Sequence, residues 1–503
     1  MVVDTASDGL LDGPSWSRPG LDVAAGRYPL SVERHVMRMV DHLVPGVTAV
    51  TPHGRYYALH GLIAAEAEVR DLTVPATQDL LRRAEVVIAT ASFAHHSQED
   101  IGWLPRAHGV DALARRLQAG DVELDDASRY GGSGYVQSVW GFWGPYAGSE
   151  TTLGILSPGP RPAPGPRLDV GAVRQGLGEV LELAAQESLH VADLTAVAER
   201  LCVCRGGDQP DGRWLAGLMC ADGGDREPDS RAEARRQTVR LLARIVSTHA
   251  VTSFTRDVGQ VLAFGPFLTA DPVTSDVETA AVWRGVVLRN YAVGAWRRLW
   301  SWLVSQVDGF MAAEDLAERL AAELPTGTVQ AFLDTLPATQ DGGGFPVPAE
   351  AALRASGHSV PLAELRVLAA SARRVDELEG RVRDAFLGQR GIELGPEWVS
   401  RRLDEAKPQQ LQDFARRLTF DLLARSRRVA LSKARRRSDG SMWLPTRLHE
   451  RGGFLFRTSQ EGRGDVGLRL DQLGSVLASA GVLQFDDEAA QWAVTAPGQV
   501  LVG

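Results

Sequence analysis

The sequence has few cysteines, no long apolar run and no strong excess of charge of one sign. Its 503 residues include only three cysteines, an odd count that gives no disulfide framework and fits a reducing compartment. No uninterrupted run approaches the ~20 apolar residues of a membrane span. Residues 1–27 also lack the continuous apolar core of a signal peptide. We therefore expect a cytoplasmic protein without a membrane partner.

Motifs that would fix a reaction are also missing. The glycines Gly131, Gly132, Gly134 and Gly141 are of the kind that cradle phosphates, but they fit neither G-x-x-x-x-G-K-[ST] nor a strand-anchored G-x-G-x-x-G. Ser133 lacks the nucleophile elbow because Tyr135 stands where the last glycine belongs. We name no catalytic residue, expect no cofactor and favour a non-enzymatic protein.

Apolar residues recur at helical spacing through most of the chain. The most apolar stretch, Val277 to Val307, is expected to be a central core helix. A chain of this length exceeds a single core. The predicted fold class is mainly α, a multidomain helical protein with a small C-terminal α/β module of winged-helix type.

Breaks in composition suggest where domains begin and end. Proline-rich residues 157–167 read as a stiff linker, or alternatively as a long loop within one domain. The expected order is a flexible lead-in at 1–27, a helical N-terminal domain at 28–156, the linker at 157–167, a helical middle domain at 168–395, a basic helix at 396–440 and the winged-helix-like module at 441–503.

The segment Arg129 to Ile155, here called the aromatic segment, combines glycines and large aromatic residues with almost no charge. Such a composition lets the backbone bend while it presents broad apolar side chains. We predict that it docks a protein partner; the alternative is that it packs in the core of this chain. The predicted partner-binding residues are Tyr135, Trp140, Phe142, Trp143 and Tyr146. Arg55, Tyr56 and Tyr57 also suit an interface, although core tyrosines beside a solvated Arg55 explain them as well.

The stretch from Arg416 to Arg437 holds nine basic residues and the single acid Asp421, in a chain of net charge −9. This local asymmetry is typical of a phosphate-contacting face, whose binding weakens with salt. The alternative is a solvated helix paired with acids elsewhere, such as Asp376, Glu377 and Glu379, or docked on an acidic subunit. The predicted nucleic-acid-binding residues are Arg416, Arg417, Arg425, Arg427, Arg428, Lys433, Arg435, Arg436 and Arg437.

Two groups of residues are weak candidates for metal ligands. The first is His95, His96, Glu99 and Asp100, whose spacing matches no established signature and whose adjacent histidines are expected to point apart. The second is Cys202, Cys204 and Cys220, which lacks a fourth ligand unless a distant histidine joins it. A solvated helix end and buried apolar thiols are the default interpretations.

Two short stretches carry resemblances. The sequence LDQLGSVLASAGVLQFDDEAAQWAVTAPG, with Leu473 and Leu477 at helical spacing, resembles the last helix and wing of a winged-helix module over residues 468–496. Its helix offers only Arg469 beside Asp471, too few donors for base reading, which favours a protein partner. The block PGVTAVTPHGRYYALH, with RRAEVVIA further on (residues 45–89), resembles uncharacterised bacterial proteins found among genome-defence genes.

Together these features predict a non-enzymatic subunit of a cytoplasmic bacterial assembly that acts on nucleic acid, with genome defence as the role that the resemblance implies. In this hypothesis the basic helix contacts phosphates and the aromatic segment docks a protein partner. Two alternatives remain. One is a metal-dependent enzyme that uses the cluster at His95, and the other is a purely structural scaffold.

Overall fold

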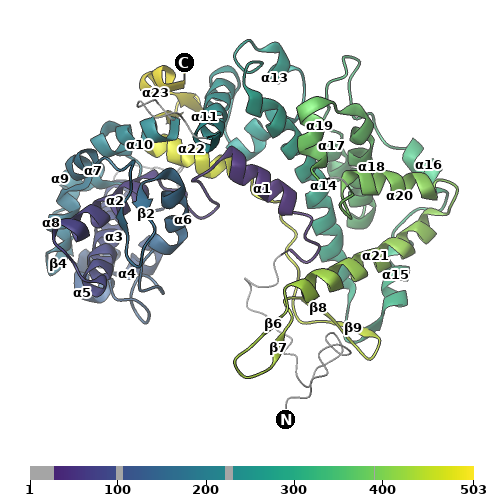
Figure 1. The fold of residues 1–503 in the computed structure, drawn as a ribbon, viewed down its shortest axis with the longest axis horizontal. Helices are drawn as coiled ribbons and strands as arrows, with labels where there is room; N and C mark the ends of the chain where they lie inside the picture. Colours follow the sequence, from purple (N-terminus) through teal and green to yellow (C-terminus); the bar gives the residue numbers. More distant parts are fainter. Residues whose placement is uncertain (1–27, 98–105, 221–229, 390, 503) are drawn as a thin grey trace. The chain divides into compact units, whose positions relative to one another are not determined.

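The computed structural model describes residues 28–97, 106–220, 230–389 and 391–502 (Figure 1). The predicted lead-in at 1–27 lies outside these ranges. The described chain consists mainly of α-helices, with small antiparallel sheets of two or three strands, so the prediction of a mainly α fold is confirmed. Within the same ranges, none of the helices has both the length and the apolar character that a membrane crossing requires.

The chain forms two compact units, neither of which is a continuous stretch of sequence. Unit 1 comprises the described residues of Met1–Met39, Leu262–Ala270 and Ala281–Val466. Unit 2 comprises those of Val40–Val261, Asp271–Ala280 and Gly467–Gly503. Three helices cross a boundary between them: α1 (Arg34–Leu43), α12 (Gly259–Ala263) and α14 (Glu278–Gln306). The boundaries of the two units therefore differ from the breaks in composition along the chain.

Unit 2 is built around α2 (Gly54–Val69), which is buried along almost its entire length. Helix α3 (Val74–His96) begins at Thr73, whose hydroxyl accepts a hydrogen bond from the backbone N–H of Ala76, a regular N-cap. The other elements of unit 2 are α4 (Val110–Ala119), β1 (Asp121–Glu123), α5 (Leu124–Ala127), α6 (Trp143–Leu153), β2 (Leu156–Ser157), β3 (Ala163–Pro164), α7 (Val170–Leu177), α8 (Glu179–Ala184), β4 (Ser188–His190), α9 (Thr195–Leu201), η1 (Gly206–Asp208), α10 (Pro210–Cys220), α11 (Ser230–Thr248), η2 (Phe254–Val258), α22 (Leu470–Ser479), β10 (Leu483–Asp486), β11 (Gln491–Val494) and α23 (Ala496–Val502).

The proline-rich residues 157–167 fold back on themselves inside unit 2. Strand β2 pairs with β3, which places Ser157 opposite Ala163. The N–H of Gly165 then donates to the carbonyl of Ile155 at 2.8 Å, and β3 packs against α2. Both ends of the segment thus lie in the same unit.

The C-terminal elements have the order expected from the sequence, namely a helix (α22) followed by an antiparallel hairpin (β10 and β11). Nearly all of α22 is buried, and the hydroxyl of Ser479 accepts a hydrogen bond from the N–H of Gly54 at the start of α2. A helix buried in this way offers little surface to a ligand. The winged-helix assignment itself remains a prediction.

Unit 1 contains most of α14, which matches the core helix predicted at Val277 to Val307. The side chains of Trp283, Trp296 and Trp300 are almost completely buried along it. The other elements of unit 1 are α13 (Phe267–Ala270), β5 (Met311–Ala312), α15 (Ala313–Ala322), α16 (Val329–Asp334), α17 (Ala349–Ala355), α18 (Val360–Glu377), α19 (Gly380–Leu387), α20 (Pro396–Ala406), α21 (Leu411–Ser432), β6 (Arg435–Arg436), β7 (Met442–Trp443), β8 (Leu448–Arg451) and β9 (Phe454–Arg457). Strands β5, β9 and β8 form one sheet in that order.

Candidate functional site

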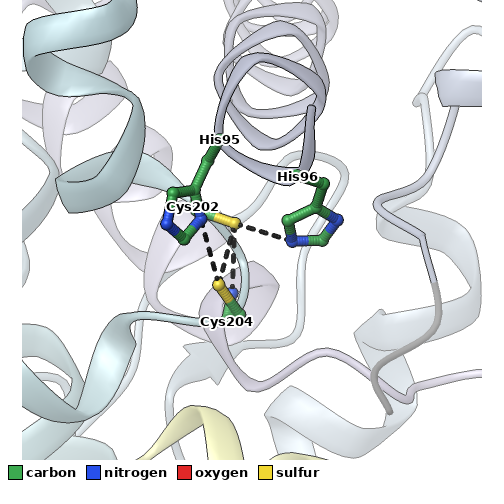
Figure 2. Close-up of side chains that lie close together, drawn as sticks. All are labelled: His95, His96, Cys202 and Cys204. Carbon is green, nitrogen blue, oxygen red and sulfur yellow. Dashed lines mark hydrogen bonds between the residues drawn. The ribbon is translucent and has the colours of Figure 1, made fainter. Parts of the chain in front are cut away.

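Four side chains that are far apart in the sequence come together in unit 2: His95, His96, Cys202 and Cys204. One donor atom from each residue lies within 4.8 Å of all the others. Figure 2 shows the Cys202 sulfur between the two imidazole rings, with the Cys204 sulfur below it. We call these four residues the His/Cys cluster. Thiolate sulfur and imidazole nitrogen are the ligands of zinc sites in proteins, so the cluster has the composition to hold a metal ion.

Each cysteine of the cluster contacts a histidine. The Nε2 atom of His96 lies 3.1 Å from the sulfur of Cys202, and Nδ1 of His95 lies 3.4 Å from the sulfur of Cys204. The two sulfurs are 3.1 Å apart. His95, Cys202 and Cys204 are buried, whereas His96 is half-buried.

Two elements of unit 2 position the cluster. The histidines form the last turn of α3, while the cysteines follow directly after α9, which packs against α3. The N–H of Val203 donates to the hydroxyl of Ser92 on α3 at 3.2 Å. This bond holds the loop that carries both thiols against the end of the helix.

Arg55 supports the same loop from α2. Its guanidinium donates to the carbonyl of Cys202 at 2.9 Å and forms two bonds of 3.1 Å with the carboxylate of Asp211. Only 1% of either side chain of this ion pair is exposed. The expectation of a solvated Arg55 is therefore wrong, because its charge is compensated by a carboxylate 156 residues away that local sequence cannot indicate.

The pKa values of the two thiols in the cluster are shifted in opposite directions. Burial would raise the pKa of Cys202, but hydrogen bonds from Cys204, His95 and His96 outweigh burial and lower that pKa far below its usual value. The hydrogen bond that Cys204 gives to Cys202, together with burial, raises the pKa of Cys204. Cys202 is thus the thiol of the pair whose deprotonation is favoured, and a thiolate is the form that binds metal.

The structure places the sequence-predicted metal ligands in three groups. His95 and His96 belong to the cluster, and Glu99 and Asp100 lie outside the described residues. Cys220 is the last residue of α10, where it is buried, and it lies outside the cluster. The sequence contained both halves of the cluster, but their proximity depends on how α3 packs against α9.

A second group of ionisable side chains is buried in unit 2. His60 of α2 contacts Glu150 of α6 through Nδ1 at 2.5 Å and Glu85 of α3 through Nε2 at 3.3 Å, and none of the three is exposed. Burial would lower the pKa of His60, but the two carboxylates outweigh it and raise that pKa to about 9. Glu150 belongs to the aromatic segment, and its contact with His60, which also contacts Glu85, connects that segment to α2 and α3.

The aromatic segment wraps around Glu85. The Tyr135 hydroxyl donates to this carboxylate, as does the N–H of Phe142 at 3.0 and 3.1 Å. Gly141 has a positive φ of 51°, and a Cβ atom there would meet the carboxylate at 2.3 Å, so only glycine allows this approach.

The predicted partner-binding residues therefore differ in exposure. Tyr135 and Tyr146 are buried in unit 2, where Tyr146 also hydrogen-bonds His108 at 3.1 Å. Buried in this way, they serve the packing of the chain itself. Trp140, Phe142 and Trp143 are half-buried, and for these residues partner docking stays a prediction.

The basic residues at 416–437 lie on α21 and on the hairpin formed by β6 and β7, in unit 1. Arg416 pairs with Glu318 and Asp413. Arg425 and Arg428 pair with Glu393, Arg427 lies 3.7 Å from Glu450, and Lys433 donates to the carbonyl of Tyr28. Much of the helix thus carries ion pairs within the chain, although the acids are not those suggested by the sequence.

The hairpin β6–β7 differs from α21. Arg435 pairs across it with Trp443 and Arg436 with Met442, and the turn closes with a bond of 2.8 Å from the N–H of Arg437 to the carbonyl of Ser441. Arg435, Arg436 and Arg437 are exposed, and within the described part of the chain none of them forms an ion pair. Figure 1 shows this hairpin following the end of α21.

Comparisons with protein-family models, with curated proteins and with solved structures give no match to this chain.

Proposed function

We propose that this protein is a non-enzymatic subunit of a bacterial assembly that acts on nucleic acid, and that it contacts phosphates through the hairpin β6–β7. The observation that carries the proposal is the division of the basic residues into two sets. On α21 the arginines are largely paired with carboxylates, whereas Arg435, Arg436 and Arg437 are exposed and have no ion pair among the described residues.

Three adjacent cations on a short hairpin form a local positive patch on an acidic chain. Such a patch can replace the counterions of a nucleic-acid backbone, and this release drives salt-sensitive binding. Trp443 faces Arg435 across the hairpin, and the guanidinium of Arg437 lies 6.0 Å from the centre of its ring. A half-buried aromatic ring beside arginines also suits stacking with an unpaired base.

Three further features support the wider proposal. The three cysteines are free thiols in the structure, as suits a cytoplasmic protein. The resemblance of residues 45–89 to proteins found among genome-defence genes connects the proposal with that role. The half-buried Trp140, Phe142 and Trp143 supply apolar surface for a protein partner.

The test compares two variants that remove the same number of charges. The hairpin variant R435Q/R436Q/R437Q neutralises the exposed cations, and the control R416Q/R425Q/R428Q neutralises paired cations on α21. Affinity for single- and double-stranded DNA and RNA is measured by fluorescence anisotropy over a series of salt concentrations.

We expect the hairpin variant to lose most of the affinity and to lower the slope of log K against log salt by about 2 to 3, because each phosphate contact contributes about 0.7 to 0.9. The control keeps most of both quantities. Wild-type protein without salt-sensitive binding, or a hairpin variant that binds like wild type, contradicts the proposal. Purification from the native host with and without nuclease then separates a nucleic-acid assembly from a protein-only scaffold.

A further inference from the structure

We propose that His95, His96, Cys202 and Cys204 form a structural zinc site that fastens the end of α3 to the loop after α9. The donor set is two thiols and two imidazoles, a composition found in closed, four-coordinate zinc sites. This inference does not depend on the proposed contact with nucleic acid, because it concerns different residues in a different unit.

The distances fit a common centre. Ligand atoms placed 2.0 to 2.3 Å from a tetrahedral zinc ion lie roughly 3.3 to 3.8 Å from one another. Contacts of 3.1 Å between the sulfurs, 3.1 Å from Cys202 to His96 and 3.4 Å from Cys204 to His95 are close to this range. All remaining pairs lie within 4.8 Å. Small side-chain rotations are enough to bring the four atoms to equal distances from one ion.

The use of two different ring nitrogens explains how adjacent histidines reach the same point. Neighbouring residues on an α-helix project about 100° apart, which normally separates their side chains. Here His95 approaches the sulfurs with Nδ1, the nitrogen nearer its backbone, and His96 approaches with the more distant Nε2. The difference in reach compensates for the difference in direction, and both rings meet the thiols (Figure 2).

Hydrogen bonding alone explains this cluster poorly. Thiols are weak donors and weak acceptors, so their mutual contacts offset little of the cost of burying three of these polar groups beside the half-buried His96. A metal ion offsets that cost through four strong bonds. The chemistry favours zinc over magnesium, calcium or manganese, because soft thiolates and imidazoles discriminate against hard cations that prefer oxygen.

The surroundings of the cluster resemble the support of a metal site. The N–H of Cys204 points to the sulfur of Cys202 at 3.5 Å, and Arg55 holds the carbonyl of Cys202. Such contacts orient ligands and tune their charge. Cys204 also lines a pocket of about 760 Å³ together with Arg205, Gly481 and Phe485, which gives an ion a route to the cluster from the side of Cys204.

With all four positions supplied by protein, the site has no open position for a substrate. Its effect is to join segments more than a hundred residues apart, as the separation of 106 residues between Cys202 and His96 shows. Because zinc binds the assembled site and not the unfolded chain, its binding free energy adds to the stability of unit 2.

The test begins with the full-length wild-type chain, purified without a histidine tag and without added metal, and analysed by elemental mass spectrometry. We expect one zinc ion per chain. The variant C202S/C204S is expected to lose the zinc, while C220S keeps it, since Cys220 is also a buried cysteine but lies outside the cluster. A strong chelator is expected to lower the unfolding temperature of wild type and to leave that of C202S/C204S unchanged.

A second measurement covers the case in which C202S/C204S fails to fold. Cobalt(II) exchanged into the wild-type protein is expected to give the visible bands of a tetrahedral thiolate-ligated ion, and C220S should give the same bands. Wild-type protein that contains no metal, shows no such bands with cobalt and readily forms a disulfide between Cys202 and Cys204 overturns the proposal. A different metal in stoichiometric amount overturns the assignment to zinc.

Discussion

Two arginine–carboxylate pairs, one from each unit, lie in opposite surroundings. In unit 2, Arg55 and Asp211 are each 1% exposed. In unit 1, Arg428 and Glu393 are 54% and 28% exposed. A surface pair is screened by water and contributes little, whereas a buried charge that loses its partner is left without compensation. The number of ion pairs therefore says little about stability, and their burial says much more.

The same difference in burial separates arginines that are available to a ligand from an arginine that serves the fold. An exposed arginine on α21 already has a carboxylate partner, so it gains little when it exchanges that carboxylate for a phosphate. The arginines of the hairpin β6–β7 have no ion pair to give up within the described chain. Arg55, in contrast, is fixed by Asp211 and by the loop of the His/Cys cluster, so its charge belongs to the interior of unit 2.

The substitution Asp211→Ala is expected to lower the free energy of unfolding more than any other change considered below. It leaves the guanidinium of Arg55 buried without its carboxylate, and we expect a loss of about 3 to 5 kcal/mol in the free energy of unfolding. Urea unfolding measures the change. The control Asp208→Ala removes an exposed aspartate from the same segment and should change stability by less than about 0.5 kcal/mol. Equal effects of the two substitutions would contradict the difference drawn here.

His449, a buried histidine in unit 1, tests whether burial also disfavours the charged form of a side chain in that unit. His449 is 6% exposed and stacks on Phe456, and burial lowers its pKa from 6.5 to about 4. Because the unfolded chain binds the proton more tightly, the stabilisation is complete above pH 6.5 and is lost as the pH falls toward 4. This group should account for up to about 3 kcal/mol.

The variant His449→Gln isolates this contribution, since glutamine keeps hydrogen-bonding atoms but does not titrate. Unfolding free energies of wild type and variant are compared between pH 7 and pH 4. We expect the advantage of wild type to shrink steadily over this interval. A difference between the two proteins that stays constant with pH would show that His449 titrates normally.

The smallest effect is expected for the exposed pair on α21. A double-mutant cycle with Arg428→Ala and Glu393→Ala should give a coupling free energy between 0 and about 1 kcal/mol, which decreases with salt. The cycle also separates the pair from the contact that Glu393 makes with Arg425. A coupling comparable to the effect of Asp211→Ala would remove the distinction between the two environments.

Sequence periodicity was enough to predict the helical part of the fold. The region predicted as a basic helix, 396–440, contains α21, Leu411–Ser432, because apolar residues at helical spacing mark the face that packs against α15. The C-terminal helix and hairpin were also predicted, since Gly481 marks the end of the helix and the acidic residues 486–488 mark the turn between the strands. Residues close together in the sequence are therefore enough to specify both α21 and the C-terminal elements.

Features that depend on distant pairing could not be predicted from the sequence. Strand β1 pairs with β4 across nearly seventy residues, and neither three-residue strand has a distinctive pattern. His95 and Cys204 have no common motif, because zinc ligands are usually recognised by C-x2–4-C and H-x3–5-H spacing. Only the packing of α3 on α9 brings the two halves of the cluster together.

The hydrogen bonds to Glu85 make the aromatic segment harder to open than its glycine-rich composition suggests. Glycine-rich loops usually open locally at little cost and belong to the least protected parts of a protein. Here, local opening would take the N–H of Phe142 and the hydroxyl of Tyr135 away from a carboxylate that is completely buried. Opening the segment therefore exposes the centre of unit 2, so amide exchange at Phe142 reports on global unfolding of the unit and not on the motion of a loop.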